Sequence, residues 1–282
     1  MKKILLTLLF FSNLFSQANR LLMLSPSAHT SSIGNVMLPM MSPARNHLDS
    51  DRFTFSRVNW LGNIVGDMNY MHVNLAKGSF DFSTLIFNYG EQLETDITGV
   101  VTGKFSPMSS VWGVSWGGVI KGYNLGVTAK VIQHDLYVQK TFGTVFDIAT
   151  YLPKVYKDLD VDLALRNFGV APTFGTFKTK LPTSINVALT YPYKQWMFYE
   201  QHNIMKNNIT SGFGVSYKYE VKDQGTIFGK AGYFVDEMHN LTYPTFGLDL
   251  KYDRYFIGMS YIYGDETLPV SNTFRLTINL EI

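Results

Sequence analysis

The sequence predicts an all-β fold, a 14-stranded antiparallel transmembrane β-barrel formed by residues 52–282, with an N-terminal luminal plug segment at residues 18–51. Three observations lead to this prediction. Apolar and polar side chains alternate with a period of two along many segments. Most of these segments are about 8 to 12 residues long, close to the length that a tilted strand needs to cross a bilayer. The connections between them alternate between short and long.

Residues 1–17 have the order of features of a secretory signal. Lys2 and Lys3 precede an apolar run over residues 4–15, and FSQA at residues 15–18 contains small residues suited to cleavage. A membrane-anchoring helix is the alternative, but the run of about a dozen residues is shorter than the roughly 20 that a helix needs to cross a bilayer. We therefore expect a cleaved signal peptide and an exported protein.

Residues 18–51 do not alternate like a membrane strand. The stretches SPSAHTSSIGN (25–35) and SPARNHLD (42–49) are rich in Ser, Gly and Pro, which indicates turns and short pieces. A barrel of fourteen strands is wider than the eight-stranded kind that side chains alone fill. We expect residues 18–51 to fold into the lumen as a plug; a flexible periplasmic tail is the alternative.

The strand pattern is clear in residues 122–133, where Tyr123, Leu125 and Val127 share one face while Asn124 and Thr128 share the other. Ordinary soluble strands average roughly five or six residues, so longer strands favour a membrane barrel over a soluble sandwich. The pattern predicts strands near residues 52–59, 65–76, 79–89, 109–120, 122–134, 142–152, 157–167, 183–191, 195–203, 210–219, 225–233, 244–252, 254–263 and 271–281.

Short connections, such as residues 77–78, 121, 153–156 and 253, follow every second predicted strand. The longest ones cover residues 89–108 and 168–182. Short turns on one side and long loops on the other are typical of outer-membrane barrels. We therefore expect the outer membrane of a Gram-negative bacterium, with both termini in the periplasm and the long loops outside the cell.

Composition and motifs argue against other classes of function. Charged residues make up 16% of the chain, below the roughly 25% of soluble domains. The net charge is only +2 and no basic cluster occurs, so nucleic acid is not an expected partner. The six histidines are scattered, and none lies in a nucleophile or metal motif. We expect no enzyme activity, no metal and no cofactor; the histidines are His29, His47, His72, His134, His202 and His239.

Two sets of side chains are candidates for function. The long loops carry apolar residues that a protein partner could bind, Leu93 and Phe105 in the first and Phe174 and Phe177 in the second. The alternative is that they pack the loops against one another or extend the strands. Charged residues on the inward faces pair across the lumen or line a polar channel, namely Lys130, Asp160, Asp162, Arg166, Asp249, Lys251 and Arg275.

The order of several short motifs resembles the PorV/PorQ family, which is related to the FadL-type fatty-acid transporters. The resemblance covers most of residues 25–192 and departs from the usual family pattern at Ser42, where Asn is common. The motifs are SSIGN (31–35), SPARN (42–46), VNWLGNIVGDMNYMHVNLAK (58–77), GVTAKVI (126–132), FDIATYL (146–152), LALRNFG (163–169) and LPTSINVALTYP (181–192).

This resemblance implies a FadL-like barrel that serves the type IX protein secretion system of a Bacteroidetes-like bacterium. Its partners would be a secreted cargo protein or other secretion-system subunits, besides outer-membrane lipid. It would bind the cargo's signal domain or anchor a surface attachment complex. The alternative is a FadL-like transporter of hydrophobic small molecules, in which glycines mark a kinked wall, namely Gly113, Gly117, Gly118 and Gly126.

Overall fold

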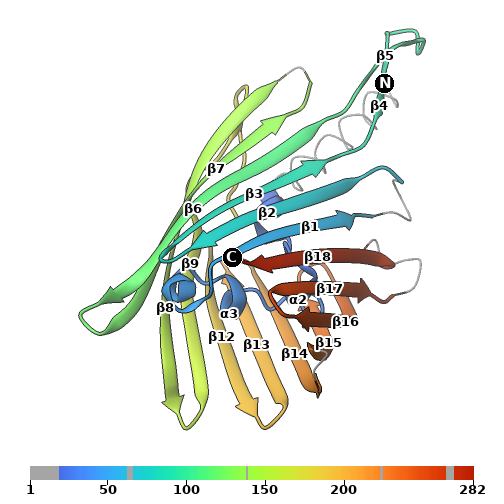
Figure 1. Ribbon diagram of the computed structural model, residues 1–282. Helices are drawn as coiled ribbons and strands as arrows, with labels where there is room; N and C mark the ends of the chain where they lie inside the picture. The colour runs from blue at the N-terminus through green and yellow to red at the C-terminus, as the bar shows by residue number, and fades with distance from the viewer. Residues whose placement is uncertain (1–18, 62–65, 138, 223–224, 265–269) are drawn as a thin grey trace.

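The computed structural model describes residues 19–282 except 62–65, 138, 223–224 and 265–269, so the expected signal peptide lies outside the described residues. Fourteen antiparallel strands close into a transmembrane barrel (Figure 1). They are β1 (Arg52–Asn59), β2 (Asn69–Lys77), β3 (Phe80–Asn88), β6 (Met108–Ile120), β7 (Tyr123–Asp135), β8 (Lys140–Tyr156), β9 (Leu159–Val170), β12 (Ser184–Tyr193), β13 (Trp196–Met205), β14 (Asn208–Val221), β15 (Gly225–Asp236), β16 (Leu241–Tyr252), β17 (Tyr255–Ile262) and β18 (Thr273–Glu281).

Each predicted segment overlaps one of these strands, which confirms the predicted 14-stranded antiparallel barrel. The clearest difference is at residues 153–156, which were expected to form a turn. Strand β8 continues to Tyr156, and the turn follows at Lys157, which has a φ of 53°. The pairing of β8 with β9 is irregular between Leu152 and Tyr156. This irregularity accommodates Pro153, which cannot donate to a regular ladder.

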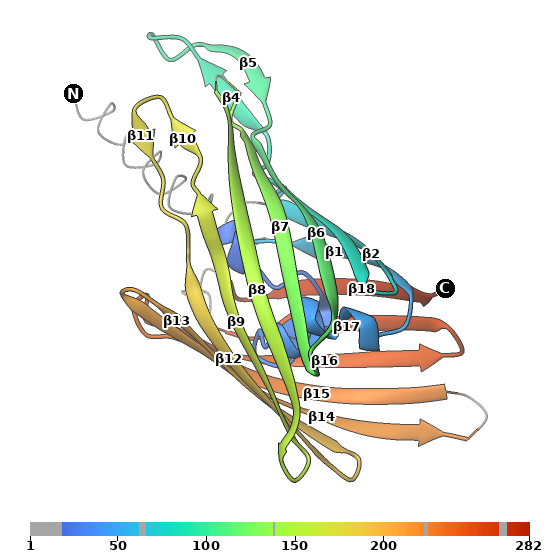
Figure 2. The ribbon, with the colours of Figure 1, turned by 90° about the vertical axis from the view of Figure 1, so that its left-hand side faces the viewer.

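The two longest loops each form a small hairpin outside the main sheet. β4 (Gln92–Thr95) pairs with β5 (Val101–Phe105), and β10 (Thr173–Phe174) pairs with β11 (Phe177–Lys178). Both hairpins project from the end of the barrel opposite the short turns (Figure 2). The barrel therefore has a short-turn end and a long-loop end, as the alternating connections predicted.

The outer surface of the barrel is apolar. Along β8, Phe142, Phe146 and Ile148 are exposed whereas Val145 and Asp147 are buried, because alternate side chains point to opposite faces of a strand. The same alternation leaves a band of large apolar side chains on the outside of the other strands, as lipid contact requires.

The N-terminal segment lies inside the ring of strands (Figure 1). It comprises η1 (Leu21–Met23), α2 (Ala28–Ser31), α3 (Leu38–Met41) and η2 (Pro43–Leu48). Contacts join α2 to β16, β17 and β18, α3 to β9 and β12, and η2 to β3, β6, β7 and β8. The segment therefore crosses the lumen from one side to the other. No helix among the described residues is long and apolar enough to span a membrane.

Candidate functional site

Glycines in the wall let the N-terminal segment approach the strands closely. Gly117 on β6 and Gly126 on β7 are direct partners in the sheet, and both face the Pro43 carbonyl group. A Cβ at either position would overlap that backbone. At this point the glycines therefore allow the backbone of the segment to approach the wall closely. The sequence had instead suggested that they mark a kinked wall.

A second glycine pair lies on the other side of the lumen. Gly214 on β14 pairs with Gly232 on β15, and Ile33 and Gly34 of the N-terminal segment lie directly against them. Gly34 itself has a φ of 73°, a left-handed conformation that glycine adopts without steric cost. The backbone of the segment thus touches the backbone of the wall on two sides of the barrel.

An ion pair joins η2 to the wall. Arg45 donates from Nη2 to the Asp162 carboxylate at 2.5 Å and from Nε at 3.0 Å. The Asp162 side chain is fully buried, and the Arg45 guanidinium lies 3.8 Å from the centre of the Tyr151 ring. A buried carboxylate needs such a partner, since an unpaired buried charge is strongly destabilising. Asp162, an inward charge, therefore pairs with the N-terminal segment.

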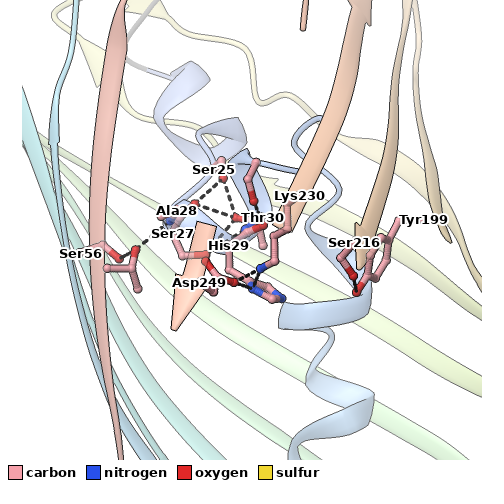
Figure 3. A network of polar contacts seen from close by, with 12 residues as sticks. Ser25, Ser27, Ala28, His29, Thr30, Ser56, Tyr199, Ser216, Lys230 and Asp249 are labelled. Atoms are coloured by element: carbon pink, nitrogen blue, oxygen red, sulfur yellow. Dashed lines mark hydrogen bonds and ion pairs between the residues drawn. The ribbon is translucent and has the colours of Figure 1, made fainter. Parts of the chain in front are cut away.

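A buried polar network joins α2 to β15 and β16. In Figure 3, Lys230 and Asp249 point toward His29, and Lys230 contacts both of the other side chains. His29 Nδ1 lies 2.6 Å from Asp249 Oδ2. Burial in the lumen lowers the pKa of His29 well below 6.5, and the nearby charges of Lys230 and Arg52 lower it further. This shift favours the neutral imidazole while the segment lies in the lumen.

Further hydrogen bonds fix the segment along its length. The Gln201 side chain on β13 accepts from the backbone N–H groups of Met37 and Leu38, at 2.9 and 2.7 Å. Asn35 donates to the Tyr243 hydroxyl at 2.7 Å, and the Ala28 N–H donates to Thr277 at 2.7 Å. These contacts anchor the segment to strands spread around the barrel. Sequence reasoning named His29 only as one of the scattered histidines and did not name Lys230, Gln201 or Tyr243, because each acts through a partner far along the chain.

A cavity of about 1260 Å³ lies between the N-terminal segment and the long-loop end. One side is apolar and aromatic, with Leu24, Trp60, Tyr89 and Phe234 among its lining residues. These belong to a luminal apolar cluster that comprises Leu21, Val58, Leu61, Met68, Tyr70, Leu85, Phe87, Tyr89, Tyr243, Ile262 and Val270, with Leu24, Trp60, Val111, Phe234 and Leu241 packed against it.

The rest of the cavity lining is polar and carries an excess of positive charge. Asn167, Asn186, Asn203 and Asn208 line it. Among the described lining residues the only carboxylate is Asp236, against six lysines and arginines: Arg20, Arg166, Lys178, Lys180, Lys206 and Arg275. The cavity can therefore take a molecule with an apolar body and a polar or anionic end.

The inward charged residues predicted from sequence bond mostly to neighbouring strands or to the N-terminal segment. Lys130 pairs with Asp147 on the adjacent strand, and Lys251 bonds to Glu281 at 2.7 Å. Arg275 lies over Trp60, 5.7 Å from the ring centre. No group of three or more potential metal ligands occurs within the described part of the chain.

The four candidate partner-binding residues differ in exposure. Leu93 and Phe177 are each 57% exposed on the loop hairpins. Phe105 is half-buried and stacks on Tyr137 at 4.7 Å. Phe174 lacks the exposure expected of it, because it is buried against His134 with 5.7 Å between ring centres. The loop hairpin folds this side chain inward, where apolar area is removed from water.

Three solved structures are similar to this chain. The toluene transporter TbuX of Ralstonia pickettii aligns with a TM-score of 0.55 and 12% identity, over 92% of this chain and 97% of that one. The toluene transporter TodX of Pseudomonas putida aligns with a TM-score of 0.55 and 10% identity, over 91% and 98%. The CymD monoaromatic hydrocarbon channel aligns with a TM-score of 0.52 and 8% identity, over 92% and 96%.

At these identities the likeness shows the fold alone, a closed antiparallel β-barrel. No protein-family model and no curated protein sequence matches the chain. The PorV/PorQ assignment stays a prediction.

Proposed function

We propose that this barrel admits hydrophobic small molecules through the cavity at its long-loop end and that the N-terminal segment acts as a plug beneath it. The observation that carries the proposal is the luminal apolar cluster. Barrel interiors are normally polar, whereas lipid-facing surfaces are apolar. Eleven buried apolar residues on the luminal side are therefore unusual for a barrel interior. Binding of an apolar ligand would explain their presence.

The proposed ligand carries a polar or anionic group. The cation excess in the cavity lining favours a carboxylate, and the asparagine side chains offer further donors. A long-chain fatty acid has this combination of parts. The structurally similar transporters and channel are named for toluene and monoaromatic hydrocarbons, which supports an apolar ligand but supplies no acidic group.

The N-terminal segment stands in the path of such a ligand. It is held by the Arg45 ion pair, by the His29 network and by close backbone contact at the glycine pairs. The proposal places the long loops and the cavity on the outer face of the membrane and both termini in the periplasm. A ligand that enters the cavity then meets the plug before it can leave the barrel.

Uptake by a deletion strain tests the proposal. The strain is complemented with the full chain or with variants, and uptake of radiolabelled oleate and toluene is measured. We expect the full chain to raise oleate uptake. Lys178→Glu with Lys180→Glu should reduce oleate uptake several-fold while toluene uptake, if present, stays unchanged. Lys194→Glu, at the short-turn end and outside the cavity lining, is the matched control. Equal uptake of both compounds by the deletion strain and the complemented strain would contradict the proposal.

A role in type IX secretion is the second candidate. The observation that favours it is the pair of loop hairpins, which present Leu93 and Phe177 to solvent beyond the barrel. Exposed apolar side chains on rigidly anchored loops suit a protein partner. Co-purification of secreted cargo or secretion-system subunits with the barrel from native outer membrane would support this role over transport.

A further inference from the structure

Three polar side chains meet on the outward face of the wall, where β13 pairs with β14. Glu200 and His202 are two residues apart on β13, so both point to the same face. Ser211 on β14 lies directly opposite His202 in the register. Their neighbours on this face, Ile204 and Phe213, are exposed and apolar. A carboxylate that faces lipid among apolar side chains destabilises the barrel. Its presence here therefore suggests a functional role.

The three side chains form a hydrogen-bonded chain in the order nucleophile, base and acid. His202 Nδ1 lies 2.9 Å from Ser211 Oγ, and His202 Nε2 lies 2.8 Å from Glu200 Oε1. With its proton on Nε2, the imidazole donates to the Glu200 carboxylate and accepts from the Ser211 hydroxyl. The ring also packs edge-on against Phe213, at 6.0 Å and 81°, which restricts its orientation. Hydrolases activate serine with this arrangement.

The cluster lies close to the long-loop end of β13 and β14. Strand β14 begins at Asn208, so Ser211 is only about 10 Å along the strand from its start at roughly 3.3 Å per residue. With a strand tilt of about 45°, Ser211 lies about 7 Å from the end of the strand along the barrel axis. The headgroup layer meets the hydrocarbon near such depths. The acyl esters of membrane lipids lie at this boundary, and a membrane surface at the end of β14 would bring them to the level of Ser211.

An apolar groove begins beside the cluster. Glu200 and Phe213 are part of its lining, and it continues along Phe198, Val215 and Tyr233 on the outer face. Its volume of about 550 Å³ falls within the range of roughly 300–1,000 Å³ that small-molecule sites occupy. An acyl chain can lie in this groove while its ester group reaches the serine.

We propose that Ser211, His202 and Glu200 form an acyl-ester hydrolase site that faces the lipid. Ser211 Oγ attacks the ester carbonyl carbon as its proton passes to His202 Nδ1. The bond to the lipid alcohol breaks, and the alcohol leaves with that proton. Water then attacks the acyl-serine and gives its proton to His202, and the fatty acid leaves as Ser211 regains a proton. Glu200 orients the imidazole and stabilises its protonated form.

The test uses the purified full-length barrel in phospholipid vesicles with and without lipopolysaccharide. Fatty-acid release is measured by mass spectrometry, and a fluorophosphonate probe labels the reactive serine. We expect label on Ser211 and none in Ser211→Ala. His202→Gln should slow release by at least about 100-fold, the typical minimum contribution of a general base, and Glu200→Gln should slow release as well. Release without lipopolysaccharide identifies a phospholipid ester, and release only with it identifies a lipopolysaccharide ester.

Ser110→Ala is the matched control. Ser110 lies on the same face of β6 as the exposed Trp112, and its hydroxyl accepts from the Trp112 indole at 3.1 Å. We expect this variant to keep both label and release. Heat-modifiable migration in gels checks that each variant forms the barrel. Absent label and release in the unmodified protein, or release that survives in Ser211→Ala, overturns the proposal. Either result leaves the uptake proposal untouched, because the site faces away from the lumen.

Discussion

Replacement of Arg45 by Met should loosen the N-terminal segment without disrupting the barrel. Methionine keeps an unbranched apolar side chain but removes the charge and the three hydrogen bonds to Asp162, which measure 2.5, 3.0 and 3.2 Å. The Asp162 carboxylate has no exposed area, so it would remain buried and unpaired. Breaking a buried ion pair in this way costs about 3–5 kcal/mol.

That cost applies only while the N-terminal segment is docked against the wall. In the undocked state, Arg45 already lies in water and there is no buried ion pair to break. The ratio of undocked to docked barrels should therefore rise by roughly a hundred- to several-thousand-fold, at tenfold per 1.4 kcal/mol. Ion conductance in planar bilayers measures this ratio, since an undocked segment leaves the lumen open. We expect Arg45→Met to open long-lived conducting states that the unmodified barrel shows rarely.

Two further variants make the result interpretable. Arg45→Met combined with Asp162→Asn removes both charges and should recover most of the loss, because no uncompensated buried charge remains. Arg254→Met removes an arginine from an exposed pair with Asp253, 3.9 Å apart, and should leave conductance unchanged. Conductance of Arg45→Met equal to that of Arg254→Met would refute the reasoning that this ion pair holds a plug.

Three other predictions follow from the same contacts. Gly232→Val should displace the segment and raise conductance, because a Cβ at this position overlaps the Gly34 backbone. Gly229→Val is the control and should leave conductance unchanged, because no atom lies within 4 Å of an added Cβ there. Equal conductance of the two variants would contradict this prediction. Because docking lowers the pKa of His29, the undocked state binds more protons below pH 6.5, and docking weakens as the pH falls. Conductance should therefore rise between pH 7 and pH 5, and His29→Gln should flatten this dependence. If the hairpins bind a secreted partner, Leu93→Asp with Phe177→Asp should reduce co-purification of cargo several-fold while oleate uptake persists; unchanged co-purification would count against that role.

The strands and their order could be predicted from the sequence because the evidence for them is local. A period of two in apolar residues sets which side chains meet lipid, and each strand carries that information within its own residues. The long loops were also visible from spacing. Their internal structure was not, since the hairpin that buries Phe174 against His134 depends on a contact between residues 40 positions apart in sequence.

Contacts between the segment and the wall could be found only in the tertiary structure. Arg45 meets Asp162 across 117 residues, and His29 meets Lys230 across 201. Alternation predicts that Asp162 points inward but cannot say which cation it meets, because closure of the barrel and the path of the segment decide that. The outward-facing cluster of Glu200, His202 and Ser211 could likewise be found only in the tertiary structure. Strand register places Ser211 opposite the imidazole, and no spacing along the chain records which residue lies across a ladder.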